Sequence, residues 1–539
     1  MLDRQAAERG ERIALRIALR SGDRAVTFGA LKAASERVAA LLRASGVEPG
    51  GRVVLVLPNG AAFFAAFFGA QRAGAVPVPV YPESGLDRVA DLAGLCGASA
   101  VVLPEDAPAA RARELAERLA ARPAAAGAPV LRAPDRAPEG AQSTPWRYTA
   151  PAAPAAPALL QYTSGSTGDP KGVIVTHAMA LTNVGQMIAG MEITAADRFV
   201  SWLPVHHDMG LLLMTLVPFF LGASLHLLPT SLTDVRRWLA AIESHRATFT
   251  AAPDFAYRLV LRSVRDPSHY DLSSLRVALD AAEPVRAETI RRFEEAFGLD
   301  RVVVAGYGLA EATVGVSMQP PGTAPVLSDR GLVSIGRPFP GVRIEIAAPR
   351  ETGRPAREAR PGEVGELRIE SPANTPGYFA NPEATEALFA RPGVVRTGDL
   401  GFRDEAGHVF LVGRAKNVII QAGMNLAPQE IEEAVEALPF VRRAAAVGID
   451  RGRAEGEQAY VFAELRRAKP PPLEDLEEMA RQVVVSFHER LGLRPGRVVL
   501  LAPRAIPLTA NGKLRHAALR RAWLDGTLRA EGRILFPEG

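Results

Sequence analysis

Ten residues about a third of the way along the chain combine small, hydroxyl and basic side chains. From Thr163 to Gly172 the sequence reads TSGSTGDPKG, directly before the apolar residues VIV. Glycines let the backbone approach a ligand closely and turn its N–H groups toward one centre. Hydroxyls add neutral donors, and Lys171 adds a point charge. This composition predicts a loop that cradles phosphate.

Two other interpretations of the loop remain to be weighed. An ordinary Gly/Ser turn is one, although the density of these residues disfavours it. A P-loop NTPase is the other, and its spacing fails, because Pro170 stands where that motif needs the Gly before Lys-Ser/Thr. We therefore expect a phosphate loop of a different family.

Length and composition restrict the class of protein. The chain has 539 residues, of which 48% are hydrophobic and 23% are charged. This length predicts two to four domains, and this balance predicts a compact soluble protein rather than a disordered one. The net charge of +4 is small for such a length. It is weak support for a nucleic-acid partner, which normally requires a clustered basic face.

The compartment is predicted from the cysteine content and the first residues. Cys96 is the only cysteine, which excludes an internal disulfide and fits a reducing cytoplasm. The first fifteen residues alternate charges, unlike a signal peptide. Residues 210–228 are apolar enough to imitate a membrane span, but Pro218 interrupts them and His226 lies near their end. We expect a buried helix followed by a strand, and no stable membrane insertion.

The elements that must position the loop alternate in type along the first third of the chain. Apolar residues at helical spacing predict helices over 27–47 and 61–75, whereas 51–58 is a short β-branched run and 76–82 an edge-like extended segment. This alternation predicts a sheet covered by helices. Residues 104–157, rich in Ala, Pro and Arg, are expected to form surface helices and then a loose connector, and 158–163 a strand before the loop.

Six further segments support a resemblance to a known family. In order they are SWLPVHHDMG from Ser201, DAAEP from Asp280, YGLAEAT from Tyr307, RTGDLG from Arg396, GRAKNVIIQAGMNLAPQEIE from Gly413 and PLTANGKLRH from Pro507. Together with the loop they resemble the signatures of the adenylate-forming enzymes, which include acyl-CoA synthetases, nonribosomal peptide adenylation domains and fatty acyl-AMP ligases. The resemblance spans nearly the whole chain.

Within that family the chain looks most like the fatty acyl-AMP ligases. The features that carry this are GDP before Lys171, HDMG from His207 and DLSSLRVALDAAEPVR from Asp271. One feature departs from the pattern: those ligases usually carry an insertion after YGLAEAT that is linked to their refusal of CoA, and here about twenty residues separate Thr313 from SIGRP.

The resemblance implies a fold and a division of the chain. It implies an α/β protein of the acyl-CoA synthetase type, with layered sheets and helices in a large N-terminal adenylation domain, residues 1–413, that holds the acyl and ATP pockets. A small mobile α+β domain, residues 414–539, would carry the catalytic lysine.

The resemblance also implies a reaction. A fatty acid would attack the α-phosphate of ATP with Mg²⁺ as cofactor, releasing pyrophosphate and leaving an acyl-adenylate. The acyl group would then pass to the phosphopantetheine thiol of an acyl carrier protein, typically in lipid, polyketide or lipopeptide biosynthesis. The alternative acceptor is CoA. A nucleotide-binding pseudoenzyme is a third interpretation, which the joint retention of Lys513, Glu311 and Asp399 disfavours.

Residue roles follow from the matched motifs. The phosphates of ATP would contact Thr163, Ser164, Gly165, Ser166, Thr167, Gly168 and Lys171. Adenine would lie against Ala282, Glu283, Tyr307 and Gly308, and the ribose would bind Asp399 and Arg414. Glu311 would hold Mg²⁺, since carboxylate oxygens are its preferred ligands. The alternatives are a surface glutamate for Glu311, a core aromatic for Tyr307 and solvated loop charges for the ribose pair.

The remaining roles concern catalysis and the acyl group. Lys513 would contact the attacking carboxylate and the α-phosphate, Lys416 would act as the hinge and Gly423 would line the acceptor tunnel. His207 would be the gate between that tunnel and an acyl pocket that includes Met209, Gly210 and Phe255. Zinc binding by His206 and His207 is disfavoured, because adjacent side chains of a strand diverge.

Overall fold

The structure is a computed structural model, and it describes residues 1–19, 22–133, 153–163, 170–230, 235–348, 357–421, 424–452, 456–467, 470–508 and 514–537. These residues divide into two compact units. The first comprises Met1–Thr163, Pro170–Glu345 and Arg368–Thr397, and the second consists mainly of Ile346–Leu367 and Gly398–Gly539.

The first unit is built on a large sheet whose strand order is β15-β14-β13-β12-β11-β9-β10-β1-β2. The pairs from β13 to β1 along this order are parallel, and the strands at both edges are antiparallel to their neighbours. The strands are β1 (Ile13–Leu19), β2 (Gly22–Thr27), β9 (Phe199–Ser201), β10 (Leu225–Leu227), β11 (Phe249–Ala252), β12 (Val277–Asp280), β13 (Val303–Gly308), β14 (Gly315–Met318) and β15 (Arg337–Pro338).

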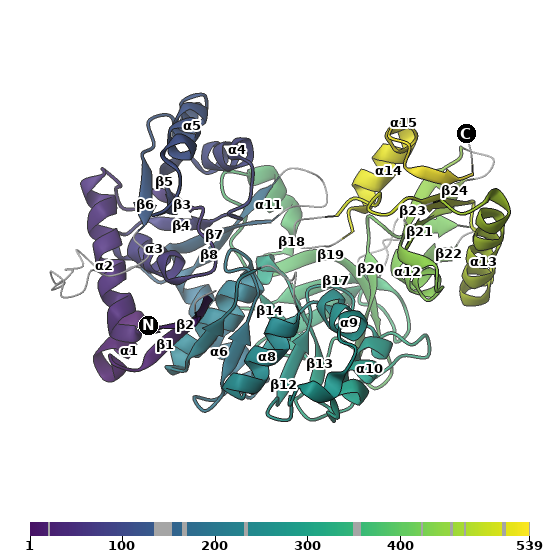
Figure 1. The fold of residues 1–539 in the computed structure, drawn as a ribbon, viewed down its shortest axis with the longest axis horizontal. Coiled ribbons are helices and arrows are strands. Elements are labelled where there is room, and N and C mark those ends of the chain that lie inside the picture. The colour runs from purple at the N-terminus through teal and green to yellow at the C-terminus, as the bar shows by residue number, and fades with distance from the viewer. Residues whose placement is uncertain are drawn as a thin grey trace. The chain divides into compact units, whose positions relative to one another are not determined.

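Helices cover this sheet because its central strands are buried on both faces. Trp238 donates to Thr250 Oγ1 at 3.0 Å, which seats one helix on β11, and Tyr257 donates to the carbonyl of Leu279 at 2.9 Å, which seats another on β12. The helices of this part are α1 (Leu2–Arg9), α6 (His177–Gly190), α7 (Val217–Leu221), α8 (Arg236–His245), α9 (Asp254–Ser263) and α10 (Ala287–Phe297). Figure 1 shows α6, α8, α9 and α10 beside the strands.

A second, parallel sheet of the first unit has the order β4-β3-β5-β6. Its elements are α2 (Phe28–Ala44), β3 (Arg52–Leu55), α3 (Ala61–Arg72), β4 (Val76–Pro79), α4 (Leu86–Cys96), β5 (Ala98–Pro104), α5 (Ala109–Ala120) and β6 (Val130–Ala133). The alternation of helix and strand predicted here is confirmed, and the proline-containing strand β4 lies at the sheet edge as expected, because Pro cannot donate to a neighbour. Strand β6 was not predicted.

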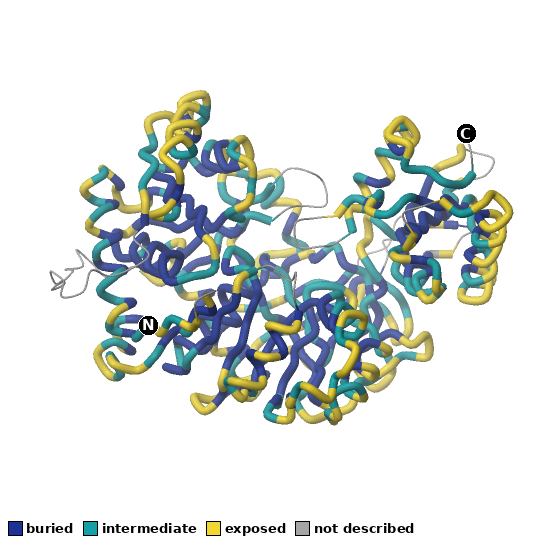
Figure 2. The backbone as a smooth tube through the Cα atoms, viewed as in Figure 1, coloured by how far each residue is buried: buried dark blue, intermediate teal, exposed yellow. Residues whose placement is uncertain are grey.

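The apolar stretch that imitates a membrane span is part of the core. Met209–Leu216 form a π-helix, α7 follows it, and β10 lies after the turn, so the predicted order of helix and strand is confirmed. Phe219 of α7 is buried against Phe28 and Phe64, with ring centroids 5.7 Å away in both cases. Figure 2 shows the central strands as buried and the outer turns as exposed. Within the described residues, no helix combines the length and hydropathy needed to cross a bilayer.

A hairpin carries the predicted phosphate loop. Strands β7 (Pro157–Thr163) and β8 (Lys171–Thr176) pair in antiparallel register, with Thr163 opposite Lys171. The strand predicted over 158–163 is therefore confirmed. Residues 164–169 and most of the predicted connector, residues 134–152, lie outside the described residues.

A smaller sheet follows in the chain, with the order β16-β17-β19-β18 and with β20 paired to β19. Its elements are β16 (Arg343–Ala347), β17 (Gly365–Glu370), α11 (Pro382–Leu388), β18 (Phe389–Arg391), β19 (Val394–Arg403) and β20 (Val409–Arg414).

The C-terminal part of the second unit is an α+β assembly around the sheet β23-β24-β25-β26. Buried residues on the two faces of this sheet form separate clusters, one with α12 and α13 and one with α14. The elements are β21 (Ile419–Gln421), β22 (Met424–Leu426), α12 (Pro428–Glu436), β23 (Val441–Asp450), β24 (Glu457–Leu465), α13 (Leu473–Leu491), β25 (Arg497–Leu501), α14 (His516–Leu524), α15 (Thr527–Ala530) and β26 (Ile534–Phe536). The predicted α/β fold class is confirmed, whereas the predicted domain boundary at residue 413 stays a prediction.

Candidate active site

Most candidate residues of the first unit follow the carboxyl ends of neighbouring parallel strands. Ala252, Asp280 and Ala305 are register partners on β11, β12 and β13, so these three strands end at one edge of the sheet. Ligands of open α/β sheets bind outside this edge. The chain places His207 after β9, Phe255 after β11, Glu283 after β12 and Glu311 after β13.

Three side chains meet at the base of the hairpin that carries the phosphate loop. Lys171, the first residue of β8, holds its ammonium 5.0 Å from the centre of the Tyr378 ring. The Tyr378 hydroxyl donates to Glu311 Oε1 at 2.7 Å. A predicted phosphate ligand and the predicted Mg²⁺ ligand therefore contact the same tyrosine. Thr163 lies across the hairpin from Lys171, whereas Ser164, Gly165, Ser166, Thr167 and Gly168 lie outside the described residues.

Backbone hydrogen bonds hold Tyr378 in this position. The amide of Phe379 donates to the carbonyl of Gly172 at 2.7 Å, and the hydroxyl of Thr375 donates to the carbonyl of Ile174 at 2.7 Å. The segment thus extends the hairpin beyond β8. The amide of Thr375 also donates to the carbonyl of Glu311 at 2.8 Å, so the same segment fixes the backbone that carries the candidate Mg²⁺ ligand.

The turn that presents Glu311 is strained. Thr313 has φ 71° and ψ −61°, and the amide of Val314 donates to the carbonyl of Ala312, which together define a classic γ-turn. The Thr313 hydroxyl donates to the carbonyl of Ala373 at 2.6 Å and holds the turn. Position 308, which packs against this turn, requires glycine, because a Cβ there would lie 1.7 Å from the carbonyl oxygen of Val314. Strain of this kind persists where surrounding contacts enforce it, typically at functional sites.

The predicted adenine segment surrounds a buried carboxyl group. Ala282 adopts a left-handed conformation with φ 69°, and Glu283 accepts a short hydrogen bond from the amide of Phe255. Asp280 is fully buried, and this burial, with the negative charges of Asp254 and Glu283, raises its pKa well above the ordinary value. Tyr307 is partly buried on β13.

The acyl-pocket candidates lie on two segments of the chain. Met209 and Gly210 begin the π-helix, a form that is rare and frequently found at functional sites. Gly210 packs so closely on the preceding turn that a Cβ would lie 2.1 Å from the carbonyl oxygen of Pro204. Phe255 is the second residue of α9, and its ring centroid lies 6.4 Å from that of Trp202, which follows β9. These apolar side chains suit an alkyl chain.

The two adjacent histidines lie in a turn after β9, which corrects the strand assumed for them. His207 Nδ1 lies 2.6 Å from Asp208 Oδ1, so the ring that would act as a gate is held by its neighbour. Burial, and then the charge of His207, lower the pKa of His206 to about 3, which keeps His206 neutral.

In the second unit, the predicted ribose ligands form one ion pair. Asp399 on β19 and Arg414 on β20 are register partners, and Arg414 Nε lies 2.7 Å from Asp399 Oδ1. Asp399 is buried and Arg414 is exposed. Lys416 is exposed in the turn that follows β20, while Gly423 and Lys513 lie outside the described residues.

Tyr378 and Asp280 are the site residues that sequence reasoning missed. Tyr378 comes from PGYFANPEAT, a segment with no charge pattern, and only its contacts with Lys171 and Glu311 reveal it. Asp280 is the first residue of DAAEP, a segment whose resemblance implies a role only for the residues that follow it. An Asp that ends an apolar run, VALD, was the signal that a carboxyl group is buried there.

Comparisons with known proteins identify the family of the chain. The family described as AMP-binding enzyme matches residues 2–379. The long-chain-fatty-acid–AMP ligase FadD32 of Mycolicibacterium smegmatis is 31% identical, with 100% of this chain and 96% of the relative covered. The medium-chain-fatty-acid–(acyl-carrier-protein) ligase JamA of Moorena producens is also 31% identical, with 89% and 87% covered.

A solved structure from studies of fatty acyl-adenylate ligases from E. coli and L. pneumophila has a TM-score of 0.82 and 27% identity, and the match covers 98% of this chain and 97% of that one. The resemblance inferred from the motifs is thereby confirmed. Because the family match extends over more than two thirds of its length, the chain belongs to the AMP-binding enzyme family.

Proposed function

We propose that the chain activates a fatty acid with ATP, forming an acyl-adenylate and pyrophosphate, and transfers the acyl group to the phosphopantetheine thiol of a carrier protein. The observation that carries this proposal is the cluster of Lys171, Tyr378 and Glu311 at the base of the phosphate-loop hairpin. The names of FadD32 and JamA support the choice of a fatty acid as substrate.

The first step joins two anions, so the site has to neutralise charge and hold the reactants in line. We assign the β- and γ-phosphates of ATP to Thr163, Lys171 and the loop residues between them. The contact of Lys171 with the Tyr378 ring positions its ammonium, since a cation is attracted to an aromatic face. Lys513 would neutralise charge where it develops, on the attacking carboxylate and the α-phosphate.

Glu311 suits a magnesium ion, which would neutralise phosphate charge when bound. Its carboxylate is partly buried and accepts one hydrogen bond from Tyr378, which fixes the orientation of the group. The γ-turn at Thr313 holds the backbone that presents it. We therefore assign Tyr378 a positioning role through Glu311.

We assign the ribose to Asp399 and Arg414. One carboxylate can accept hydrogen bonds from both ribose hydroxyls, and the ion pair with Arg414 fixes the orientation of Asp399. We further propose that residues 414–539 form a mobile domain with its hinge at Lys416, that Gly423 lines the thiol tunnel, and that adenine binds beside Ala282, Glu283, Tyr307 and Gly308.

We assign the acyl chain to the apolar segments that contain Met209, Gly210 and Phe255, with His207 as the gate toward the thiol. A carrier protein is the preferred acceptor because JamA is named for that acceptor. CoA remains a second candidate, because the segment after Thr313 is short and contains the strand β14. We place the reaction in the cytoplasm, in keeping with a single, buried cysteine.

The proposal is tested by mass spectrometry of reactions that contain ATP, Mg²⁺ and a series of fatty acids. We expect acyl-AMP and pyrophosphate from the unmodified chain, and neither from the Lys513→Ala and Glu311→Gln variants, whose folding is checked by circular dichroism. A chain that forms no acyl-AMP from any fatty acid, or a Lys513→Ala variant that retains full activity, would contradict the proposal.

A further inference from the structure

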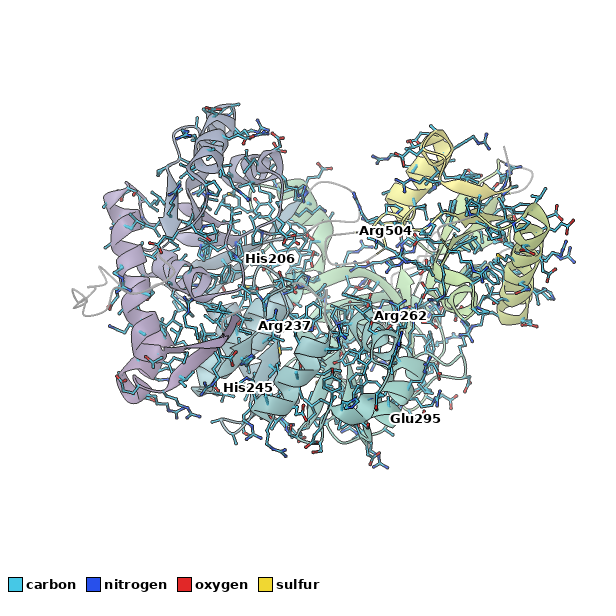
Figure 3. The ribbon with its side chains drawn as sticks, viewed as in Figure 1. His206, Arg237, His245, Arg262, Glu295 and Arg504 are labelled. Atoms are coloured by element: carbon cyan, nitrogen blue, oxygen red, sulfur yellow. The ribbon has the colours of Figure 1, made fainter. Side chains whose placement is uncertain are left out.

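Three side chains with metal-binding atoms lie close together in the first unit, and none of them belongs to the candidate active site. They are Asp23 of β2, His226 of β10 and His245, the last residue of α8, and their ligand atoms lie within 4.8 Å of one another. Figure 3 shows His245 well separated from His206, which neighbours the proposed gate.

The sheet register explains why these residues meet. Strand β1 lies between β10 and β2, with Arg16 paired to His226 on one side and Ala18 paired to Asp23 on the other. Arg16 and Ala18 are two residues apart and point to the same face, so His226 and Asp23 share that face. Helix α8 packs on the neighbouring strands and ends at His245, because Arg246 adopts a left-handed conformation with φ 45°.

The two separations measured from Asp23 match those of a tetrahedral ion. Asp23 Oδ2 lies 3.5 Å from His226 Nδ1 and 3.3 Å from His245 Nε2. Zinc bonds to imidazole nitrogen and carboxylate oxygen are about 2.0–2.2 Å long, so two ligands of a tetrahedral site lie about 3.3 Å apart. Both separations from Asp23 are close to this ligand–ligand distance. Both are also long for charge-assisted hydrogen bonds, which are about 2.7–2.9 Å.

His226 carries an observation that points independently to a ligand. The residue is only 5% exposed, and its Nδ1 is buried without a hydrogen-bond partner among the described residues. A buried polar atom of this kind calls for an explanation, such as an ion that the atom would bind. An imidazole nitrogen is among the commonest protein ligands of zinc.

The surrounding charges act in both directions. Arg16 is close enough to lower the pKa of both histidines, and its charge opposes a bound cation. The Asp23 carboxylate offsets that charge. The carboxyl end of α8 also favours a cation, since a helix carries about half a negative charge there.

We propose that Asp23, His226 and His245 bind one divalent cation of the zinc class, with water as the fourth ligand. Asp23 is 38% exposed, so the fourth position faces solvent. Such an ion would join the edge strand β2 to β10 and α8, three elements far apart in the sequence. The site is structural: it stabilises the first unit and takes no part in the chemistry proposed for the active site.

The test uses the full chain without an affinity tag, after treatment with a chelator. Titration with Co²⁺ is followed by visible absorption, where a tetrahedral ion gives intense bands, and Zn²⁺ uptake is measured by equilibrium dialysis and elemental analysis. We expect about one tightly bound ion per chain. We also expect Zn²⁺ to raise the midpoint of thermal unfolding, because binding to the folded state stabilises it.

Two variants and one matched control assign the ion to these residues. Asp23→Asn keeps the size of the side chain and His226→Ala removes the orphaned nitrogen, and each is expected to weaken binding by more than about tenfold. His269→Ala is the control. His269 Nδ1 lies 3.4 Å from Asp266 Oδ2 on the exposed surface, and the group of three ligands found among the described residues does not include it. The proposal is overturned if the intact chain binds no ion, or if Asp23→Asn binds Co²⁺ with unchanged affinity and spectrum.

Discussion

The positioning of Glu311 by Tyr378 gives the sharpest mutational prediction. Tyr378→Phe removes the hydroxyl that donates to Glu311 Oε1 at 2.7 Å and leaves the ring in place. The contact of that ring with the Lys171 ammonium, at 5.0 Å, is retained. The substitution therefore separates the orientation of the carboxylate from the placement of the lysine.

The expected loss follows from the chemistry of the bond. A hydrogen bond to a charged group contributes about 1.5–3 kcal/mol net, and Tyr378 is only 9% exposed, so water replaces the hydroxyl poorly. If the hydrogen bond stabilises the transition state by this amount, its loss lowers kcat/KM for acyl-adenylate formation about 10- to 100-fold. The Mg²⁺ concentration needed for half-maximal rate should rise as well, because the metal ligand is no longer held.

The assay measures acyl-AMP in single turnovers across a range of Mg²⁺ concentrations. Tyr81→Phe is the matched control, because Tyr81 donates to Glu83 Oε2 at the same 2.7 Å but on the exposed surface. We expect less than about a twofold change there, since exposed contacts of this kind contribute little. If Tyr378→Phe behaves like Tyr81→Phe, the positioning role of Tyr378 is refuted.

Three further substitutions test other parts of the site. Gly308→Ala should destabilise the first unit by about 3 kcal/mol, because its Cβ would lie 1.7 Å from the carbonyl oxygen of Val314; an unchanged denaturant midpoint would contradict this. Asp280 has a raised pKa, so its contribution to stability is complete below the ordinary Asp value of about 3.9 and is lost as the pH rises toward the folded-state value. Asp280→Asn should therefore increase stability at pH 7 and flatten the pH dependence of unfolding, and a less stable variant at pH 7 would count against the raised pKa of Asp280. Arg414→Lys loses the planar fork that pairs with Asp399, so the KM for ATP should rise several-fold with little change in kcat, and an unchanged KM would remove Arg414 from the ribose site.

Local patterns predicted much of the fold. The β-branched run of β3, the prolines of β4 and the helical spacing of α2 each reflect local chemistry, and the structure confirms all three. The π-helix at Met209 and the strand β6 were not predicted, since both depend on packing against distant elements. Hydrophobic periodicity does not distinguish a π-helix from other buried helices.

The same difference between local patterns and distant contacts applies to the residues of the candidate site. Motifs alone assigned Asp399 and Arg414 to the same ribose, because each residue lies in a segment with a recognisable pattern, and the structure pairs the two side chains. The contacts of Tyr378 join residues separated by more than sixty positions, and no local pattern encodes them. The metal-binding cluster was missed for the same reason, since Asp23, His226 and His245 meet only through sheet register.

The most direct test of the proposed function is a comparison of acceptors. Acyl-AMP formed by the unmodified chain would be followed by mass spectrometry without acceptor, with CoA, and with a phosphopantetheinylated carrier protein. The account predicts that acyl-AMP persists without acceptor and is consumed by the carrier protein, with little acyl-CoA. Rapid formation of acyl-CoA, with the carrier protein left unmodified, would contradict it and would establish CoA as the acceptor.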